Sequence, residues 1–117
     1  MNPTTVIFTD NARQDLADIR FFQEYIQEIP TDIAINIGVS LREKTSNILT
    51  YLPNAGTLYG FKGAKEVRTI VTMHKYMIYY HYDEVSDTVN ILHVFCTLMD
   101  DKFLRNRLLE EGIYTVR

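Results

Sequence analysis

The chain has 117 residues, of which 46% are hydrophobic and 23% are charged, the proportions of one ordinary globular domain. Its formal net charge of −3 excludes the broadly basic surface that non-specific nucleic-acid binding requires. The single cysteine, Cys96, excludes an internal disulfide. No apolar run reaches the ~18–20 residues of a membrane span, and Asp10 interrupts any signal-peptide pattern. We therefore expect a cytoplasmic protein with no membrane partner.

The first 30 residues predict a strand followed by a helix. Residues 5–8 form a short β-branched and aromatic run, which is typical of a strand. Thr9 or Asp10 then offers an N-cap oxygen for a helix over residues 11–29, which Pro30 ends. The apolar stripe of this helix consists of Ala12, Leu16, Ile19, Phe22 and Ile26. The polar residues that we place off the stripe are Arg13, Asp15, Asp18, Gln23 and Glu24.

A second helix is predicted over residues 32–52, between capping residues at 31–32 and Pro53. Its stripe is Ile33, Ile37, Leu41, Ile48 and Leu52, with a polar break at Lys44 and Thr45. Ala34 and Gly38 are four residues apart and share a face, where small side chains allow the first helix to approach closely. Because so few residues join the two helices, we expect an antiparallel helical hairpin.

The remainder of the chain is predicted to be mainly β-structure. Residues 66–71, 76–82 and 88–95 have strand propensity and form a predicted antiparallel meander, after a loop over 57–64 that could include a short strand at 58–59. Residues 101–111 predict a short C-terminal helix. The fold class is therefore α+β, with a strand and a helical hairpin packed on one face of a small antiparallel sheet.

Burial can be predicted for particular side chains of this fold. Alternation along residues 76–82 sends Tyr76, Ile78, Tyr80 and Tyr82 to one face of the sheet. It sends Met77, Tyr79 and His81 to the other face, which we expect to be open. The predicted core consists of Leu16, Ile19, Ile37, Leu41, Ile78, Ile91 and one of Tyr80 or Tyr82.

Three motifs in this order resemble the RelE/ParE superfamily of bacterial toxins. The first is an "A..DL..I" helix at residues 12–19 with Tyr25 following, and the second is a "P..G" turn from Pro53 to Gly56. The third is a "Y.I.Y….D…V.IL.V" hairpin that runs from Tyr76 to Val94 and follows Arg68. The resemblance spans roughly residues 6–100. It implies the toxin fold, a role in type II toxin–antitoxin systems such as those that stabilise plasmids, and a cognate antitoxin protein as partner.

The chain departs from the family pattern at several basic positions. Met77 stands where the ribonucleases of the family often carry Arg, and Thr57 stands where Arg usually follows the turn. Cys96 and Met99 align with a His and an Arg of ParE-like members, although Asp100 matches the acidic residue that follows. The resemblance thus implies a ParE-like toxin, which would poison a host target such as DNA gyrase by protein contact and would not be an enzyme.

The resemblance leaves two alternatives open. One is a divergent RelE-like mRNA endoribonuclease that acts at the ribosome, with Arg68, His81 and Tyr79 as catalytic candidates for proton transfer and phosphate charge. The other is a non-toxic relic that retains antitoxin binding. His81 and His93 have a simpler interpretation as hydrogen-bonded structural residues, and His74 as a solvated turn residue.

The candidate binding residues lie around the predicted hairpin of the sheet. A local basic group in an acidic protein, together with side chains of the open face, indicates a surface for the antitoxin or the target. These residues are Lys62, Lys65, Arg68, Lys75, Met77 and Tyr79. The isolated histidines lack metal-ligand spacing, so we expect no metal and no cofactor. We also expect no direct sequence-specific DNA binding by the chain alone.

Overall fold

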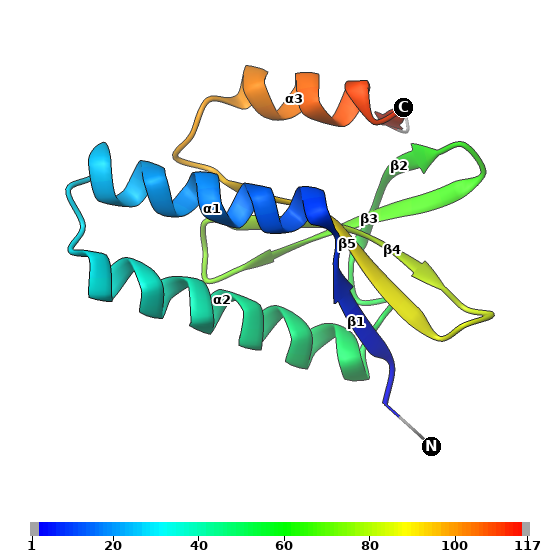
Figure 1. Ribbon diagram of the computed structural model, residues 1–117. Helices are drawn as coiled ribbons and strands as arrows, with labels where there is room; N and C mark the ends of the chain where they lie inside the picture. The colour runs from blue at the N-terminus through cyan, green and yellow to red at the C-terminus, as the bar shows by residue number, and fades with distance from the viewer. Residues whose placement is uncertain (1–2, 116–117) are drawn as a thin grey trace.

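The computed structural model describes residues 3–115, with the side chains of residues 101 and 103 left out of the description. Within this range the chain forms three helices and six strands (Figure 1). In chain order they are β1 (Thr5–Phe8), α1 (Asp10–Tyr25), α2 (Thr31–Tyr51), β2 (Thr57–Lys62), β3 (Lys65–Thr72), β4 (Tyr76–Asp83), β5 (Thr88–Cys96), α3 (Asp101–Glu110) and β6 (Ile113–Thr115). None of the helices in this range is long and apolar enough to span a membrane.

The described strands form one sheet in the order β1-β5-β4-β3-β2-β6. The predicted antiparallel meander is confirmed as β3, β4 and β5, with Arg68 opposite Tyr80 and Tyr79 opposite His93. The first strand, β1, adds to β5 in parallel, so the sheet is mixed. Two strands were not predicted in full: β2 replaces most of the expected loop, and β6 pairs with β2 at the far edge.

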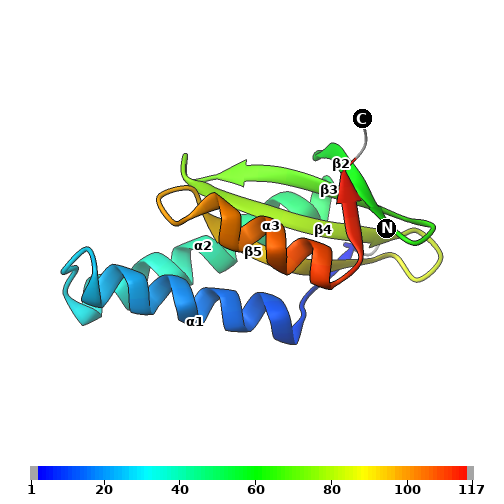
Figure 2. The same cartoon turned by 90° about the horizontal axis from the view of Figure 1, so that it is seen from above.

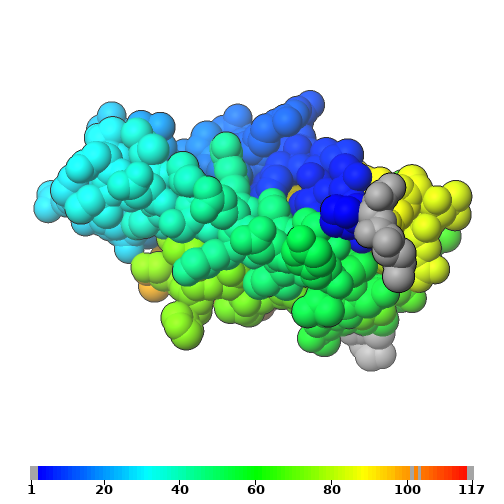
Figure 3. Space-filling model, turned by 90° about the horizontal axis from the view of Figure 1, so that it is seen from below, coloured from blue at the N-terminus to red at the C-terminus, as the bar shows by residue number. Residues whose placement is uncertain are grey.

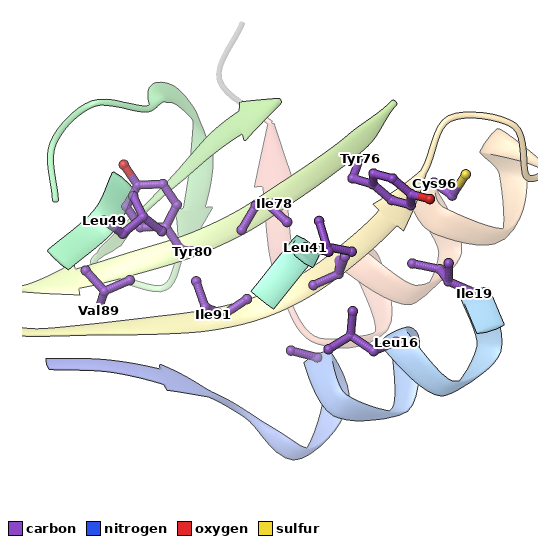
Figure 4. Packing of buried hydrophobic residues seen from close by; sticks show 12 residues of the cluster. Leu16, Ile19, Leu41, Leu49, Tyr76, Ile78, Tyr80, Val89, Ile91 and Cys96 are labelled. Atoms are coloured by element: carbon purple, nitrogen blue, oxygen red, sulfur yellow. The ribbon is translucent and has the colours of Figure 1, made fainter. Parts of the chain in front are cut away.

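The α1–α2 helical hairpin covers one face of the sheet, and the main core lies between them (Figure 4). The predicted core residues Leu16, Ile19, Leu41, Ile78 and Ile91 are buried, as is Tyr80. Ile37 is half-buried and packs at the edge of this cluster. The predicted hairpin and most of its contacts with the sheet are therefore confirmed.

The C-terminal helix lies on the opposite face of the sheet from α2 (Figure 2). Its Leu104 and Leu108, with Ile113 of β6, pack against Tyr79 and Phe95 in a second buried cluster. The alternation predicted along β4 is confirmed, because Tyr76, Ile78 and Tyr80 face the hairpin while Tyr79 faces α3. However, the second face of the sheet is not open at Tyr79, since α3 and β6 lie over it.

The predicted stripe of α2 was partly wrong. Ile33 is 48% exposed and Leu52 is 62% exposed, and Ile48 also faces outward. The buried residues of this helix are Ala34, Leu41, Thr45 and Leu49. Their separations of seven and four residues define one helix face. Thr45, which was expected to interrupt the buried stripe, is itself buried. Its place on the inner face of the helix decides its burial, although its side chain carries a hydroxyl group.

The "P..G" turn is held by two side chains of the sheet. The Gly56 amide donates a hydrogen bond to the Tyr80 hydroxyl over 2.9 Å, and Arg68 Nη1 donates to the Gly56 carbonyl over 2.9 Å. A Cβ atom at residue 56 would lie 2.7 Å from the Tyr80 hydroxyl oxygen, so only glycine fits. These contacts explain physically why a glycine turn, an arginine and a strand tyrosine occur together in this sequence.

Candidate partner-binding groove and a buried ionic cluster

A groove of about 460 Å³ runs between the outer sides of α1 and α2, and we call it the hairpin groove. Gly38 lies in its lining, and apart from its chain neighbours and the backbone of its own helix no described atom comes within 4 Å of the position that a Cβ would take. Phe21, Ile35 and Val39 also line the groove, and each is at least 42% exposed. Figure 3 shows the outer face of the hairpin, with α1 in blue beside α2 in cyan and green. The groove therefore offers apolar surface with open space above a glycine.

Further apolar side chains are exposed along the same two helices and their ends. They are Tyr25, Ile26, Ile33, Ile48, Tyr51 and Leu52. The rings of Phe21 and Tyr25 lie 4.6 Å apart and form one exposed aromatic pair. A soluble monomer rarely exposes so many large apolar side chains on one element pair, which indicates a protein-binding surface.

The charged residues in the lining of the hairpin groove are mostly cationic. They are Arg13, Arg20, Arg42 and Glu24. Arg13 forms an ion pair with Asp10, and Arg20 Nε lies 3.3 Å from Glu24 Oε2. Because these pairs are on the surface, each contributes little to stability and exchanges readily with other partners. An apolar segment with acidic flanks would complement this groove.

The predicted basic group does not form one patch. Lys62 and Lys65 lie together at the turn between β2 and β3. Lys75 lies in the turn at the other end of the eight-residue strand β3, roughly 23 Å away at the rise of an antiparallel strand. Arg68 lies between them, but its guanidinium is engaged with Gly56 and, at 3.4 Å, with Glu66.

The three catalytic candidates do not converge either. Arg68 reaches Gly56 on the hairpin side of the sheet, beside Tyr80. Tyr79 faces α3 on the other side and is 2% exposed. The His81 ring is held by its Nδ1 atom, 2.7 Å from the Glu66 carbonyl oxygen. The sheet therefore separates the candidate phosphate cation from the candidate tyrosine.

The structure contains a buried ionic cluster that the sequence interpretation missed, centred on Asp15 of α1. One Asp15 oxygen accepts a hydrogen bond from the Val94 amide over 3.0 Å and lies 2.7 Å from His93 Nδ1. Its second oxygen pairs with Arg107 of α3, whose guanidinium also lies 3.3 Å from Asp18. The Asp15 carboxylate thus joins α1, β5 and α3.

His93 completes the cluster and is 1% exposed. Its Nε2 atom lies 2.7 Å from a Glu111 oxygen, close enough for an ion pair although the alignment is not that of a hydrogen bond. Burial lowers the pKa of His93, but the hydrogen bond and charge of Asp15, together with Glu111, outweigh burial and raise the pKa above its usual value. The structure therefore gives His93 a structural role, as the simpler interpretation of the sequence proposed.

Placing Asp15 and Gln23 off the stripe of the first helix was wrong, and helical spacing contained the signal. Asp15 is three residues after Ala12 and four before Ile19, so it lies on the buried face. Gln23 follows Ile19 by four and donates a hydrogen bond to the Tyr76 hydroxyl over 2.7 Å. A polar residue at a stripe position predicts a buried partner, not a solvated face.

The chain was compared with protein-family models, with curated proteins and with solved structures. No protein-family model and no curated protein matches the sequence. Among solved structures, the chain is similar to a chain of the RelBE2 toxin–antitoxin complex from Mycobacterium tuberculosis, with 25% identity and a TM-score of 0.57 over 80% of this chain and 98% of that one. It is also similar to a chain of the chromosomal ParDE toxin–antitoxin system of P. aeruginosa, with 17% identity and a TM-score of 0.62 over 80% and 95%.

These two neighbours represent the RelE and ParE branches, and both align with almost the whole of their own chains. This similarity of fold agrees with the resemblance carried by the sequence motifs, which include the "A..DL" helix with Asp15 and the glycine turn held by Tyr80. The likeness does not separate the two branches. The chain has the fold of the RelE/ParE superfamily of toxins.

Proposed function

We propose that this chain is the toxin of a type II toxin–antitoxin system, held inactive by a cognate antitoxin that binds the hairpin groove. The observation that carries the proposal is the exposed apolar lining of this groove in a chain whose structural neighbours come from toxin–antitoxin complexes. An amphipathic helix placed in such a groove would bury Phe21, Ile35 and Val39. Acidic residues beside its apolar stripe would meet the groove arginines.

We further propose that the free toxin acts by protein contact, as ParE-like toxins do, with DNA gyrase as the target. Two observations support contact over ribonuclease chemistry. His93 is enclosed by Asp15 and Glu111, where no RNA hydroxyl can reach it. Arg68 and Tyr79 lie on opposite faces of the sheet, whereas RNA cleavage needs its cation and its proton-transfer groups around one phosphate.

Among the candidate basic residues, Lys62 and Lys65 are the best placed to contact a target. Both are exposed at the tip of the β2–β3 hairpin, away from the hairpin groove. Arg68 has a different role, because its loss would release the Gly56 turn as well as any contact. Replacing Lys62 and Lys65 together by Ala should therefore reduce toxicity with little loss of stability, whereas Arg68→Ala should reduce both.

The antitoxin-binding part of the proposal is tested by Gly38→Ala. An alanine is accommodated in the free protein and favours the helix by roughly 1 kcal/mol, so stability should rise. In the complex the added methyl group would press on the bound helix, at a cost of about 1–3 kcal/mol, or roughly 5- to 150-fold in affinity. Binding of the antitoxin encoded beside this gene is measured by calorimetry, with Lys44→Ala on the exposed side of α2 as the control. Unchanged affinity for Gly38→Ala would place the antitoxin elsewhere.

The mode of toxicity is tested by expressing the chain with and without that antitoxin. We expect growth arrest and altered DNA supercoiling with the toxin alone, and rescue when both proteins are present. His81→Gln should leave toxicity nearly unchanged at matched expression. Ribosome-dependent cleavage of a reporter transcript that is lost in His81→Gln would instead establish the ribonuclease, since removing a general base typically reduces the rate 10²- to 10⁴-fold. Absence of any growth effect would identify a relic.

A further inference from the structure

A second cavity, of about 730 Å³, lies between the sheet and the C-terminal elements α3 and β6, and we call it the α3 pocket. Figure 2 shows α3 and β6 lying over the strands that form its other wall. The pocket is on the side of the sheet away from α2, so it is separate from the hairpin groove. Its volume is within the range of about 300–1,000 Å³ that is usual for small-molecule sites.

The sheet contributes an aromatic wall to the α3 pocket. The rings of Tyr59 and Tyr79 meet edge to face, with centroids 4.9 Å apart and planes at 86°. Met77 lies beside them, and its sulfur accepts a contact of 3.8 Å from the Tyr79 hydroxyl. Leu104 and Leu108 of α3 form part of the opposite wall. Such a slot favours a flat aromatic body, which gains edge and face contacts with tyrosine rings and with sulfur.

Arg105 is the one charged side chain in the lining of the α3 pocket within the described residues. It is exposed, and its charge acts on the Tyr59 hydroxyl: burial raises the pKa of Tyr59, and the nearby guanidinium opposes that rise. No carboxylate is among the lining residues that the structure describes. An anion at the end of a bound molecule would therefore meet a guanidinium and a phenol hydroxyl, both of which can donate hydrogen bonds.

The cover provided by α3 and β6 determines the size of the occupant. Tyr79 is 2% exposed and Leu108 is 1% exposed, so a flat protein surface cannot reach them while α3 stays in place. A small molecule that enters beside Arg105 and the exposed Tyr114 can reach the aromatic wall. We propose that the α3 pocket binds a small aromatic monocarboxylate of one or two rings, with its ring against Tyr59 and Tyr79 and its carboxylate on Arg105.

The experiment uses 2-naphthoate as the probe and the full chain labelled at the methionine methyl groups. Binding should shift the NMR signal of Met77, which lines the pocket, and leave that of Met73, which packs on the hairpin side, in place. The neutral analogue 2-naphthalenemethanol should bind about three- to tenfold more weakly, because it loses a partly exposed charge-assisted contact. Met77→Leu assigns the signal.

Two variants separate the carboxylate contact from general apolar binding. Arg105→Gln should weaken the binding of 2-naphthoate by the same factor of about three to ten and leave the affinity for the neutral analogue unchanged. Lys102→Gln is the matched control, because it removes an exposed cation from the same helix outside the pocket. It should change the affinity for neither ligand.

Three results would overturn the proposal. The first is equal binding of the acid and the alcohol, and the second is a Met73 shift as large as that of Met77. The third is tighter binding of adenosine monophosphate than of 2-naphthoate, which would make the α3 pocket a nucleotide site. Because the readout is direct binding, the result does not depend on toxicity or on the antitoxin.

Discussion

Asp15 shows how much one side chain can contribute to the architecture of a small domain. The strand β1 pairs with β5 over residues 88–91, and within residues 3–115 no strand borders the next part of β5 on that edge. Asp15 takes the place of the missing strand by accepting the Val94 amide, and it also pairs with His93 and Arg107. Removing one member of such a buried ionic cluster leaves the remaining charges without compensation, at a typical cost of about 3–5 kcal/mol.

The raised pKa of His93 makes the stability of the cluster dependent on pH. The groups that face the ring are Asp15 from α1 and Glu111 from the end of α3, with Arg107 and Asp18 paired beyond them. A protonated His93 balances the charges of Asp15 and Glu111, whereas a neutral one does not. Since the folded pKa lies above the unfolded value, this stabilisation is fully present below about pH 6.5 and is lost as the pH rises through the folded pKa.

We therefore predict that the stability difference between the wild-type protein and His93→Gln is largest near pH 5.5 and shrinks towards pH 9. The measurement is urea unfolding at a series of pH values, with the two proteins compared at each one so that the other carboxylates cancel. His74→Gln, at an exposed turn, serves as the control and should show no such trend. A difference that grows with pH would mean that His93 is neutral in the folded protein.

At the scale of the elements, helix α2 shows where sequence periodicity succeeds and where it fails. The pattern located the helix and its buried Leu41. It wrongly placed Ile33, Ile48 and Leu52 on the buried face because they are apolar. Apolar residues on a surface that binds a partner have the same composition as a core. A sequence alone therefore cannot assign them to one or the other, whereas the strands of the meander were located within one or two residues.

The two classes of α2 residue should respond differently to truncation. Leu41→Ala should cost about 2–5 kcal/mol of unfolding free energy, because Leu41 is 1% exposed and its loss leaves a cavity. Ile48→Ala, on the outward side, should cost about 0.5 kcal/mol or less. Chemical denaturation of both variants tests this. Similar losses in the two would show that Ile48 belongs to the core of the free protein.

The pairing of β6 with β2 depends on Gly60. A Cβ at residue 60 would lie 1.7 Å from the Tyr114 carbonyl oxygen, which is backbone and cannot rotate away. Gly60→Ala should therefore displace β6 and expose the amides of residues 113–115, without unfolding the hairpin. Hydrogen exchange measures this, with Thr57→Ala in the same strand as the control. Full protection of β6 in Gly60→Ala would mean that the edge adapts more easily than this contact indicates.

At the scale of the whole molecule, the fold was predictable because its parts are local. The hairpin and the meander arise from neighbouring segments, and each has its own periodicity and turn residues. The parallel β1–β5 pair, the β6–β2 pair and the contacts of Asp15 with His93 and Arg107 join residues about 50 to 100 positions apart. Nothing in local periodicity specifies such distant partners, so the ionic cluster and the cover over Tyr79 could not be predicted from the sequence.

We predict that the pure protein binds no stoichiometric zinc. The described residues contain no group of three or more His, Cys, Asp or Glu side chains arranged to hold a metal ion. His93 is committed through both ring nitrogens to carboxylates, and the His81 Nδ1 atom is committed to a carbonyl. Elemental analysis after gel filtration should find less than about one-tenth of a zinc ion per chain, since structural sites are filled stoichiometrically. One zinc per chain would contradict this.

The position of α3 and β6 at the C-terminal side of the chain has a consequence for translation. During synthesis the α1–α2 hairpin leaves the ribosome first, and Arg107 and Glu111 follow only after β5 has been made. Until then His93 and Asp15 lack two of their partners, and Tyr79 and Phe95 lack their cover. The helical hairpin that forms the proposed antitoxin surface is thus synthesised early, and the elements that cover the opposite face of the sheet are synthesised late. A nascent chain could therefore be captured by its antitoxin before the second half of its own core has closed.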